Sequence, residues 1–270
     1  MTAPEPPLAE LPPDPPEMPF EVLLPPALHA TTAKRPNEHP KKVPNRFIPS
    51  YHSIRKNMSN ATAPSSAFLT RLSAVGVVAV IRAASVDAAL ACSHALVRGG
   101  VTGLEITFST PGAAEAIARA RRELPDALVG AGTVLDQASL SAACDAGTSF
   151  LVSPHTDEAL LAAARERGVP FLPGALTPTE ILRAWQLGAA CVKVFPGSAV
   201  GPSYVKALKA PLPHIALMPT GGVDEKNLGE WLAAGAVAVG MGGALATGTP
   251  EAMEAAARRI SAALRAARGG

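Results

Sequence analysis

The sequence predicts an α/β protein of the (β/α)8, or TIM-barrel, class on three observations. From residue 77 onward, short apolar segments alternate with alanine-rich segments of helical length, and this unit occurs eight times. Strands that alternate with helices pair in parallel. Eight such units in about 200 residues fit a closed barrel near its lower size limit. An open doubly wound sheet is the alternative, but it requires a glycine-rich fingerprint after the first strand, where the chain reads RAAS at 82–85.

The apolar segments place the strands, and cap residues place the helices between them. We expect strands at residues 77–82, 103–108, 128–132, 150–153, 170–173, 191–195, 215–218 and 236–240. We expect helices at residues 85–98, 111–124, 136–145, 157–167, 178–187, 203–209, 225–234 and 250–266. Ser85, Asp136 and Thr177 stand at helix starts, where a side-chain oxygen can accept from free N–H groups. Proline in a first turn and glycine after a last turn mark other limits, as at Pro111 and Gly99.

The chain divides into two parts by composition. Residues 1–66 are rich in proline and charged residues and cannot bury enough apolar surface to fold alone. We therefore expect a disordered extension, or an early start with Met58 as the natural one. Residues 67–270 are expected to form a compact single barrel domain.

Composition also excludes several classes of function. The net charge of +2 gives no argument for nucleic-acid binding, and no apolar run reaches the roughly 18 residues of a membrane span. Cys92, Cys144 and Cys191 are odd in number and far apart, which fits neither a disulfide framework nor a zinc site. We expect buried thiols and a cytoplasmic protein.

Two ionisable residues lie in the middle of strand-like segments. Lys193 stands inside the apolar run 189–197, and Glu105 alternates with Leu104 and Ile106. Side chains of a strand alternate between two faces, so both should point into the barrel if their neighbours face the helices. A lone lysine would more often reach solvent from an edge strand. Here the second and sixth strands can bring the two long side chains together near the centre, where they form the candidate catalytic pair.

Glycine-rich turns follow the last two strands. Barrels often bind phosphate at this place through loop N–H groups, which glycine leaves accessible. Ordinary strand-to-helix turns are the alternative for either loop alone. Because both loops are glycine-rich, we expect an anion site there, formed by Thr220, Gly221, Gly222, Gly242 and Gly243.

Taken together, these segments resemble the bacterial class I 2-keto-3-deoxy-6-phosphogluconate (KDPG) aldolases, which include enzymes that also act on 4-hydroxy-2-oxoglutarate. The resemblance runs from about Val77 to Gly248 and excludes the extension. It is carried by the order and spacing of GLEIT at 103–107, VGAGTV at 129–134, VSPH at 152–155, PG at 173–174, VKVFP at 192–196 and PTGGV at 219–223.

The resemblance implies a homotrimeric barrel that acts on a small 2-keto acid with no metal and no other cofactor. It implies that Lys193 forms a Schiff base with the keto acid and that Glu105 moves protons. Thr133 and Pro154 would line the pyruvate end, and Phe195 would pack beside the imine. KDPG would give pyruvate and glyceraldehyde 3-phosphate, and 4-hydroxy-2-oxoglutarate would give pyruvate and glyoxylate.

Two positions depart from this pattern. Some members have an arginine four residues after the glutamate, where this chain has Ser109. We expect Arg82 to supply the charge for the substrate's carboxylate or phosphate instead. Many members have a serine where this chain has Gly243. The alternatives are therefore an aldolase for the galactonate epimer or for an unphosphorylated hydroxy-keto acid. Alternatives from other classes of function are a phosphate-binding barrel isomerase and a non-enzymatic barrel that serves as a scaffold for a functional extension.

Overall fold

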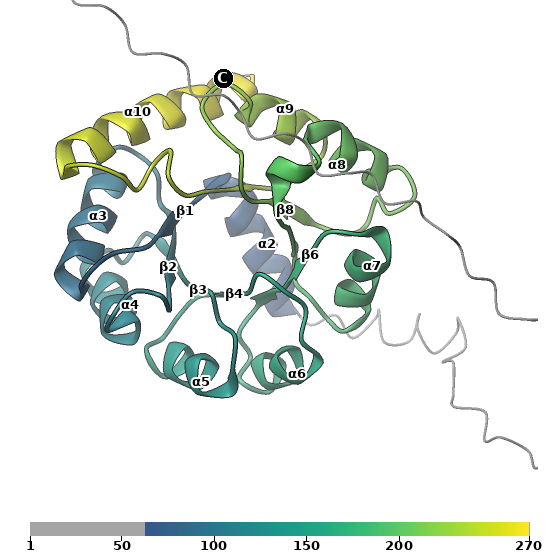
Figure 1. Ribbon diagram of the computed structural model, residues 1–270, viewed down its shortest axis with the longest axis horizontal. Helices are drawn as coiled ribbons and strands as arrows, with labels where there is room; N and C mark the ends of the chain where they lie inside the picture. The colour runs from purple at the N-terminus through teal and green to yellow at the C-terminus, as the bar shows by residue number, and fades with distance from the viewer. Residues whose placement is uncertain (1–62, 270) are drawn as a thin grey trace, which may run out of the picture. The chain divides into compact units, whose positions relative to one another are not determined.

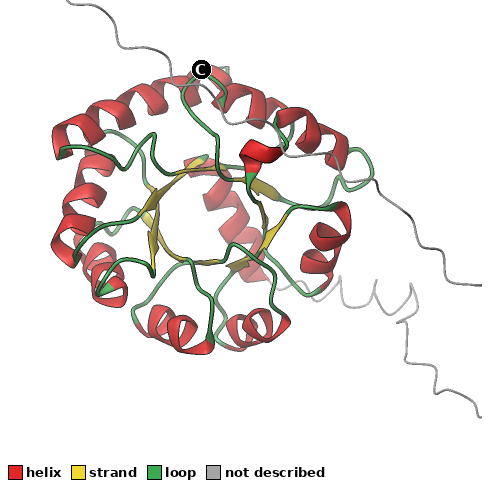
Figure 2. Ribbon diagram, viewed as in Figure 1, coloured by secondary structure: helices red, strands yellow, loops and turns green. Residues whose placement is uncertain are grey.

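Parallel strands curl around a common axis with helices on their outer side in the computed structural model, which describes residues 63–269 (Figures 1 and 2). The disordered extension and the start at Met58 lie outside the described residues, apart from the last four residues of the extension. Within the described range, no helix combines the length and the apolar character that a membrane span requires.

All paired strands are parallel and form two sheets. The six-stranded sheet has the order β5-β4-β3-β2-β1-β9, and the three-stranded sheet has the order β6-β7-β8. The strands are β1 Val77–Ile81, β2 Gly103–Thr107, β3 Leu128–Gly132, β4 Leu151–Val152, β5 Phe171–Leu172, β6 Gly174–Ala175, β7 Val192–Val194, β8 Leu217–Pro219 and β9 Val239–Met241.

Backbone contacts continue from one sheet to the other at both edges. Only Pro173 separates β5 from β6, and its carbonyl accepts from the Lys193 N–H of β7 at 2.9 Å. At the other edge, Thr220 forms a parallel bridge with Gly240 of β9. Figure 2 shows the strands of both sheets following one another around the axis.

Helices follow the strands along the chain and cover them from outside (Figure 1). They are α3 Val86–Arg98, α4 Ala113–Glu123, α5 Gln137–Asp145, α6 Glu158–Glu166, α7 Pro178–Gln186, α8 Pro202–Lys209, α9 Leu228–Ala233 and α10 Pro250–Ala267, with a short 3-10 helix at Gly197–Ala199. The predicted N-caps are confirmed, because the side chains of Ser85, Asp136 and Thr177 each accept from a first-turn N–H.

Several predicted limits were wrong. The helix expected from 225 begins at Leu228, because Asp224 and Asn227 fold the preceding residues into a turn through their side chains. The helix expected from Pro111 begins after Gly112, which adopts a left-handed conformation (φ 72°). The last two strands begin later than predicted, because the residues before them close helix-to-strand turns, as where Ala236 N–H donates to the Trp231 carbonyl.

A helix before the first strand was not predicted. Helix α2, Ala63–Val75, includes residues 63–66, which were wrongly assigned to the disordered extension. Its side chains Phe68 and Leu72 are buried in a cluster with Val78, Leu128 and other residues from the beginnings of the strands. Helix α2 therefore covers the end of the strands opposite to their carboxyl ends.

Two apolar clusters lie on opposite faces of the strands. The larger one fills the space between strands and helices and contains Leu104, Ile106, Val192 and Val194. The smaller one lies inside the strands against α2. The alternation of side chains then turns Glu105 inward, as predicted.

The three cysteines form no disulfide in the described part, and Cys92 and Cys191 are buried as expected, whereas Cys144 is only half-buried.

Candidate active site

Lys193 and Glu105 meet inside the strands, as the alternation predicts. Lys193 stands at the middle of β7 and is 5% exposed, and Glu105 stands at the middle of β2 and is fully buried. The Lys193 Nζ lies 3.7 Å from the Glu105 Oε1. Burying two charged groups costs several kcal/mol per ion, and only good geometry offsets this cost. Such a pair is therefore a candidate functional site rather than an evident stabilising interaction.

The Glu105 carboxylate is free to take part in proton transfer. Neither of its oxygens has a hydrogen-bond partner among residues 63–269. Burial raises the pKa of the Glu105 carboxyl, while the positive charges of Lys193 and Arg82 act in the opposite direction. A carboxyl group with a raised pKa is a better base, and as an acid it is available closer to neutral pH.

Gly132 leaves the space that the Glu105 side chain occupies. A Cβ atom built at Gly132 would lie 2.1 Å from the Glu105 Oε1 and 2.6 Å from its Cγ. The sequence predictions included the neighbouring Thr133 but not Gly132. Gly132 is the last residue of β3, the strand next to Glu105, so a glycine beside a long inward-facing side chain is the signal that could have found it.

Of the predicted pyruvate-end residues, Phe195 lies beside Lys193, and Pro154 packs against the neighbouring strand. The Phe195 ring centroid lies 5.2 Å from the Lys193 Nζ. Gly174 pairs in register with Lys193, and a Cβ built at Gly174 would lie 2.2 Å from the carbonyl of Pro154, so Pro154 packs against that strand. Thr133 has a φ of 56°. This is a strained conformation for a β-branched residue, of the kind that clusters at functional sites.

The predicted anion loops lie at the carboxyl ends of β8 and β9. Thr220 is buried, and its hydroxyl has no partner in the part of the chain that the structure describes. A Cβ atom at Gly240 would lie 2.3 Å from that hydroxyl oxygen, so the glycine makes room for it. Gly221 and Gly222 have φ values of 94° and 72°, which only glycine adopts readily.

Arg82 joins the two halves of the site. It directly follows β1 and is exposed. Its Nη1 lies 3.9 Å from the position that a Cβ would take at Gly242, in the loop after β9, and Gly243 follows in that loop. Its charge also acts on Glu105. Arg82 therefore reaches the loop after β9, one of the two predicted anion loops.

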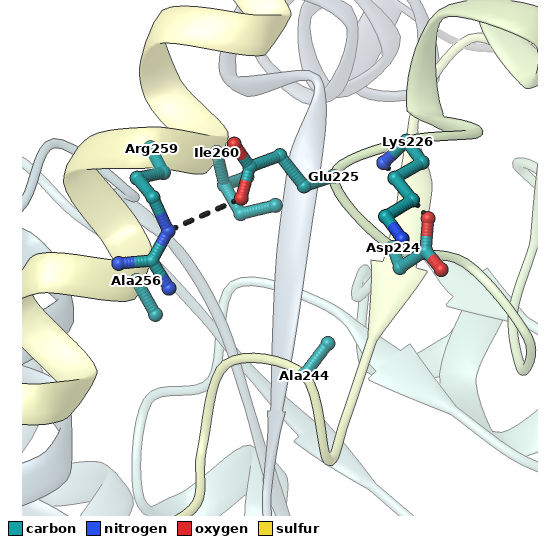
Figure 3. A pocket seen from close by; sticks show the side chains of 7 residues that line it. All are labelled: Asp224, Glu225, Lys226, Ala244, Ala256, Arg259 and Ile260. Atoms are coloured by element: carbon teal, nitrogen blue, oxygen red, sulfur yellow. Dashed lines mark hydrogen bonds and ion pairs between the residues drawn. The ribbon is translucent and has the colours of Figure 1, made fainter.

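A separate hollow of about 560 Å³ lies on the outer side of these loops. Figure 3 shows it between the turn 224–226, Ala244 and side chains of α10, with the ion pair between Arg259 and Glu225 at 3.2 Å. It contains none of the predicted site residues.

In the described range, no group of three His, Cys, Asp or Glu side chains is placed to hold a metal ion.

The fold and this pair of residues define an α/β enzyme with a buried lysine and glutamate on the inner face of parallel strands. A family described as KDPG and KHG aldolase matches residues 69–257. The chain belongs to this family.

Individual relatives agree with the family match. The 2-dehydro-3-deoxy-phosphogluconate aldolase of Treponema pallidum is 40% identical over 163 residues, which are 60% of this chain and 78% of that protein. The 2-dehydro-3-deoxy-6-phosphogalactonate aldolase of Escherichia coli is 37% identical over 167 residues, 61% of this chain and 82% of that one. A KDPG aldolase from Legionella pneumophila, solved with pyruvate captured as a covalent carbinolamine, has a TM-score of 0.64 at 31% identity and covers 76% of this chain and 98% of its own.

Proposed function

We propose that this protein is a class I aldolase that cleaves KDPG to pyruvate and glyceraldehyde 3-phosphate through a Schiff base on Lys193. The observation that carries the proposal is the inward-facing Lys193 with its Nζ 3.7 Å from the Glu105 carboxylate. Membership of the aldolase family supports the same reaction. We further propose that 4-hydroxy-2-oxoglutarate is cleaved more slowly, to pyruvate and glyoxylate.

The chemistry assigns a role to each of the two residues. The neutral amine of Lys193 adds to the C2 carbonyl of the keto acid, and loss of water gives an iminium. When the C3–C4 bond breaks, its electron pair moves toward C2, while the C4 hydroxyl loses its proton to Glu105 and becomes the aldehyde. Return of a proton to C3 and hydrolysis of the imine then release pyruvate and regenerate Lys193.

The remaining residues are assigned by their place in the strands and loops. Phe195 lies beside Lys193, and we assign it, with Thr133 and Pro154, to the pyruvate part of the substrate. The turn at 220–222 and the loop at 242–243 would hold the phosphate through backbone N–H groups. Arg82 reaches the second of these loops, so we assign it to the phosphate rather than to the carboxylate.

We also propose that the two sheets complete an eight-stranded (β/α)8 barrel. In this barrel β5 and β6 are one strand interrupted by Pro173, and the Thr220–Gly240 bridge closes the ring. Residues 1–62 would be an extension outside the catalytic domain. We propose a homotrimer. A neighbouring structure with a TM-score of 0.69, a cage designed by fusing symmetric oligomeric domains, supports oligomerisation. The free cysteines of the described part fit a cytoplasmic location.

The epimeric substrate 2-dehydro-3-deoxy-6-phosphogalactonate is the second candidate. The Escherichia coli relative that is named for that activity supports this candidate. The two substrates differ only in stereochemistry, and the same Lys193 and Glu105 would act on both. Comparison of kcat/KM for the two purified epimers decides between them.

Borohydride reduction in the presence of pyruvate tests the mechanism. We expect a stable pyruvate adduct on Lys193, located by peptide mapping, together with loss of activity, and no effect of excess EDTA. Lys209 is the internal control, because its Nζ donates to the carbonyls of Pro213 and Ile215 on the other end of the strands. An adduct on Lys209 or Lys206 would contradict the proposal.

A further inference from the structure

Thr107 and Thr110 fix the backbone on both sides of Arg82, and we propose that they are positioning residues for its guanidinium group. The proposal rests on the proposed function in one respect only, which is that Arg82 binds the anionic end of the substrate.

The contacts come from Thr107, the last residue of β2, and from Thr110 in the turn that follows it. The Thr107 hydroxyl donates to the carbonyl of Ile81 at 3.0 Å, and the Ala83 N–H donates to the Thr110 hydroxyl oxygen at 3.1 Å. The peptide groups before and after Arg82 are therefore each held by a threonine. Thr107 is fully buried and Thr110 is 2% exposed, whereas Arg82 is exposed.

The two threonines act as one unit. The Thr110 N–H donates to the Thr107 carbonyl at 2.9 Å, which forms a tight turn between them. Thr107 gives its only hydroxyl proton to Ile81, so Ser109 must be the donor in the 2.8 Å contact between their hydroxyl oxygens. Ser109 thereby holds the Thr107 hydroxyl in the orientation that serves Ile81.

This arrangement matters because an arginine side chain has high rotamer freedom. Ordering such a side chain on binding an anion costs entropy, and a fixed backbone limits the positions that the guanidinium can reach. Arg82 directly follows β1 and lies outside the hydrogen-bonded part of that strand. The threonine hydroxyls therefore hold the base of a side chain that extends toward Gly242.

Thr107→Val and Thr110→Val remove the hydroxyls with little change of shape, and Thr107→Ser and Thr110→Ser keep them. Thr148→Val is the matched control, because Thr148 is also buried and its hydroxyl donates to a backbone carbonyl, that of Phe150, at 2.8 Å. Steady-state kinetics on KDPG give kcat and KM for each variant. Thermal unfolding with and without inorganic phosphate measures anion binding without turnover, because a ligand of the folded state raises the Tm.

We expect each valine variant to raise KM by about three- to tenfold, the effect of one lost hydrogen bond, with kcat within about twofold. The serine variants should restore KM, and Thr148→Val should leave it unchanged. In an Arg82→Ala background the valine changes should raise KM no further, because the residue that they position is absent. The phosphate-induced rise in Tm should shrink in the valine variants in the same way.

Unchanged KM and phosphate response in the valine variants, with both altered in Arg82→Ala, would overturn the proposal. Additive effects in the Arg82→Ala background would also overturn it, as would a wild-type protein that phosphate does not stabilise. If one valine variant does not fold, the other and its serine counterpart decide. Failure of the proposed function is a separate outcome, recognised by the lack of a pyruvate adduct on Lys193. In that case the phosphate-induced change in Tm still decides whether Thr107 and Thr110 position Arg82.

Discussion

The ring centroid of Phe68 lies 5.7 Å from that of Phe150, and the two ring planes are inclined by 41°. Phe68 belongs to α2, and Phe150 directly precedes β4. Both side chains are buried, so this contact joins α2 to the interior of the strands. The folded unit therefore begins within α2 rather than at the first strand.

A chain that starts at Met58 should keep the Tm and kcat of the full chain within error, because it retains α2 and the composition of the preceding residues provides no core. Thermal unfolding and activity measure these effects. A lower Tm or a dissociated oligomer after the truncation would contradict a passive extension.

Phe68→Ala should lower the free energy of unfolding by about 3–5 kcal/mol, as expected for removal of a buried aromatic ring. Thr70→Ala on the exposed side of α2 is the control and should change stability little. Chemical unfolding measures both changes.

Glu105→Gln should lower kcat by about 10²–10⁴-fold, since it keeps the size of the side chain but removes the base. KM should change little, because the amide fills the same space beside Lys193. Steady-state cleavage of KDPG measures both constants. Turnover within twofold of wild type would show that another group moves the proton.

Gly132→Ala should impair catalysis through Glu105. The added methyl group would lie 2.1 Å from the Glu105 Oε1, so the carboxylate has to move. A displacement of about 1 Å can cost 10²-fold in rate, and overpacking typically costs about 1–3 kcal/mol of stability. Gly229→Ala on α9 is the control, because its Cβ would meet nothing closer than 3.5 Å. Equal kcat in Gly132→Ala and wild type would contradict the steric role.

Much of this site follows from alternation along the chain, and the rest depends on contacts between distant segments. The inward placement of Glu105 and Lys193 follows from a period of two within apolar strands, which any sequence displays directly. The need for glycine at 132 depends on a side chain from the neighbouring strand, so it can be recognised only once the pairing of β2 with β3 is known. Helix α2 was missed because its serine-rich sequence has weak amphipathic character, and its burial comes from the interior of the strands.

Arg82→Ala should shift the acid limb of the kcat/KM profile to higher pH. In the proposed mechanism the acid limb reports the ionisation of Glu105, and burial raises the pKa of that carboxyl. Removing the positive charge of Arg82 removes an interaction that lowers this pKa, so protonation should persist to higher pH. Arg82→Lys, which keeps a positive charge, is the control. An unchanged acid limb in Arg82→Ala would show that the guanidinium does not act on Glu105.

Gly243→Ser should strengthen the preference for a phosphorylated substrate. A Cβ at Gly243 would meet only the Thr247 hydroxyl oxygen, at 4.0 Å, so a serine side chain fits without moving the loop. A neutral hydrogen bond contributes on the order of 0.5–1.5 kcal/mol, which corresponds to an improvement in kcat/KM of up to about tenfold. The measurement is kcat/KM for KDPG, for its unphosphorylated form and for 4-hydroxy-2-oxoglutarate.

Gly243→Ala separates the hydroxyl from the added carbon in this experiment, since it fills the same space without a donor. We expect KDPG to be the best of the three substrates for the wild-type protein, because in the proposed site the loop N–H groups and Arg82 would supply most of the anion binding. The serine should increase the ratio of KDPG to its unphosphorylated form, and the alanine should not. If the unphosphorylated acids are preferred by the wild-type protein and the serine changes no ratio, the loops at 220–222 and 242–243 are turns that bind no phosphate.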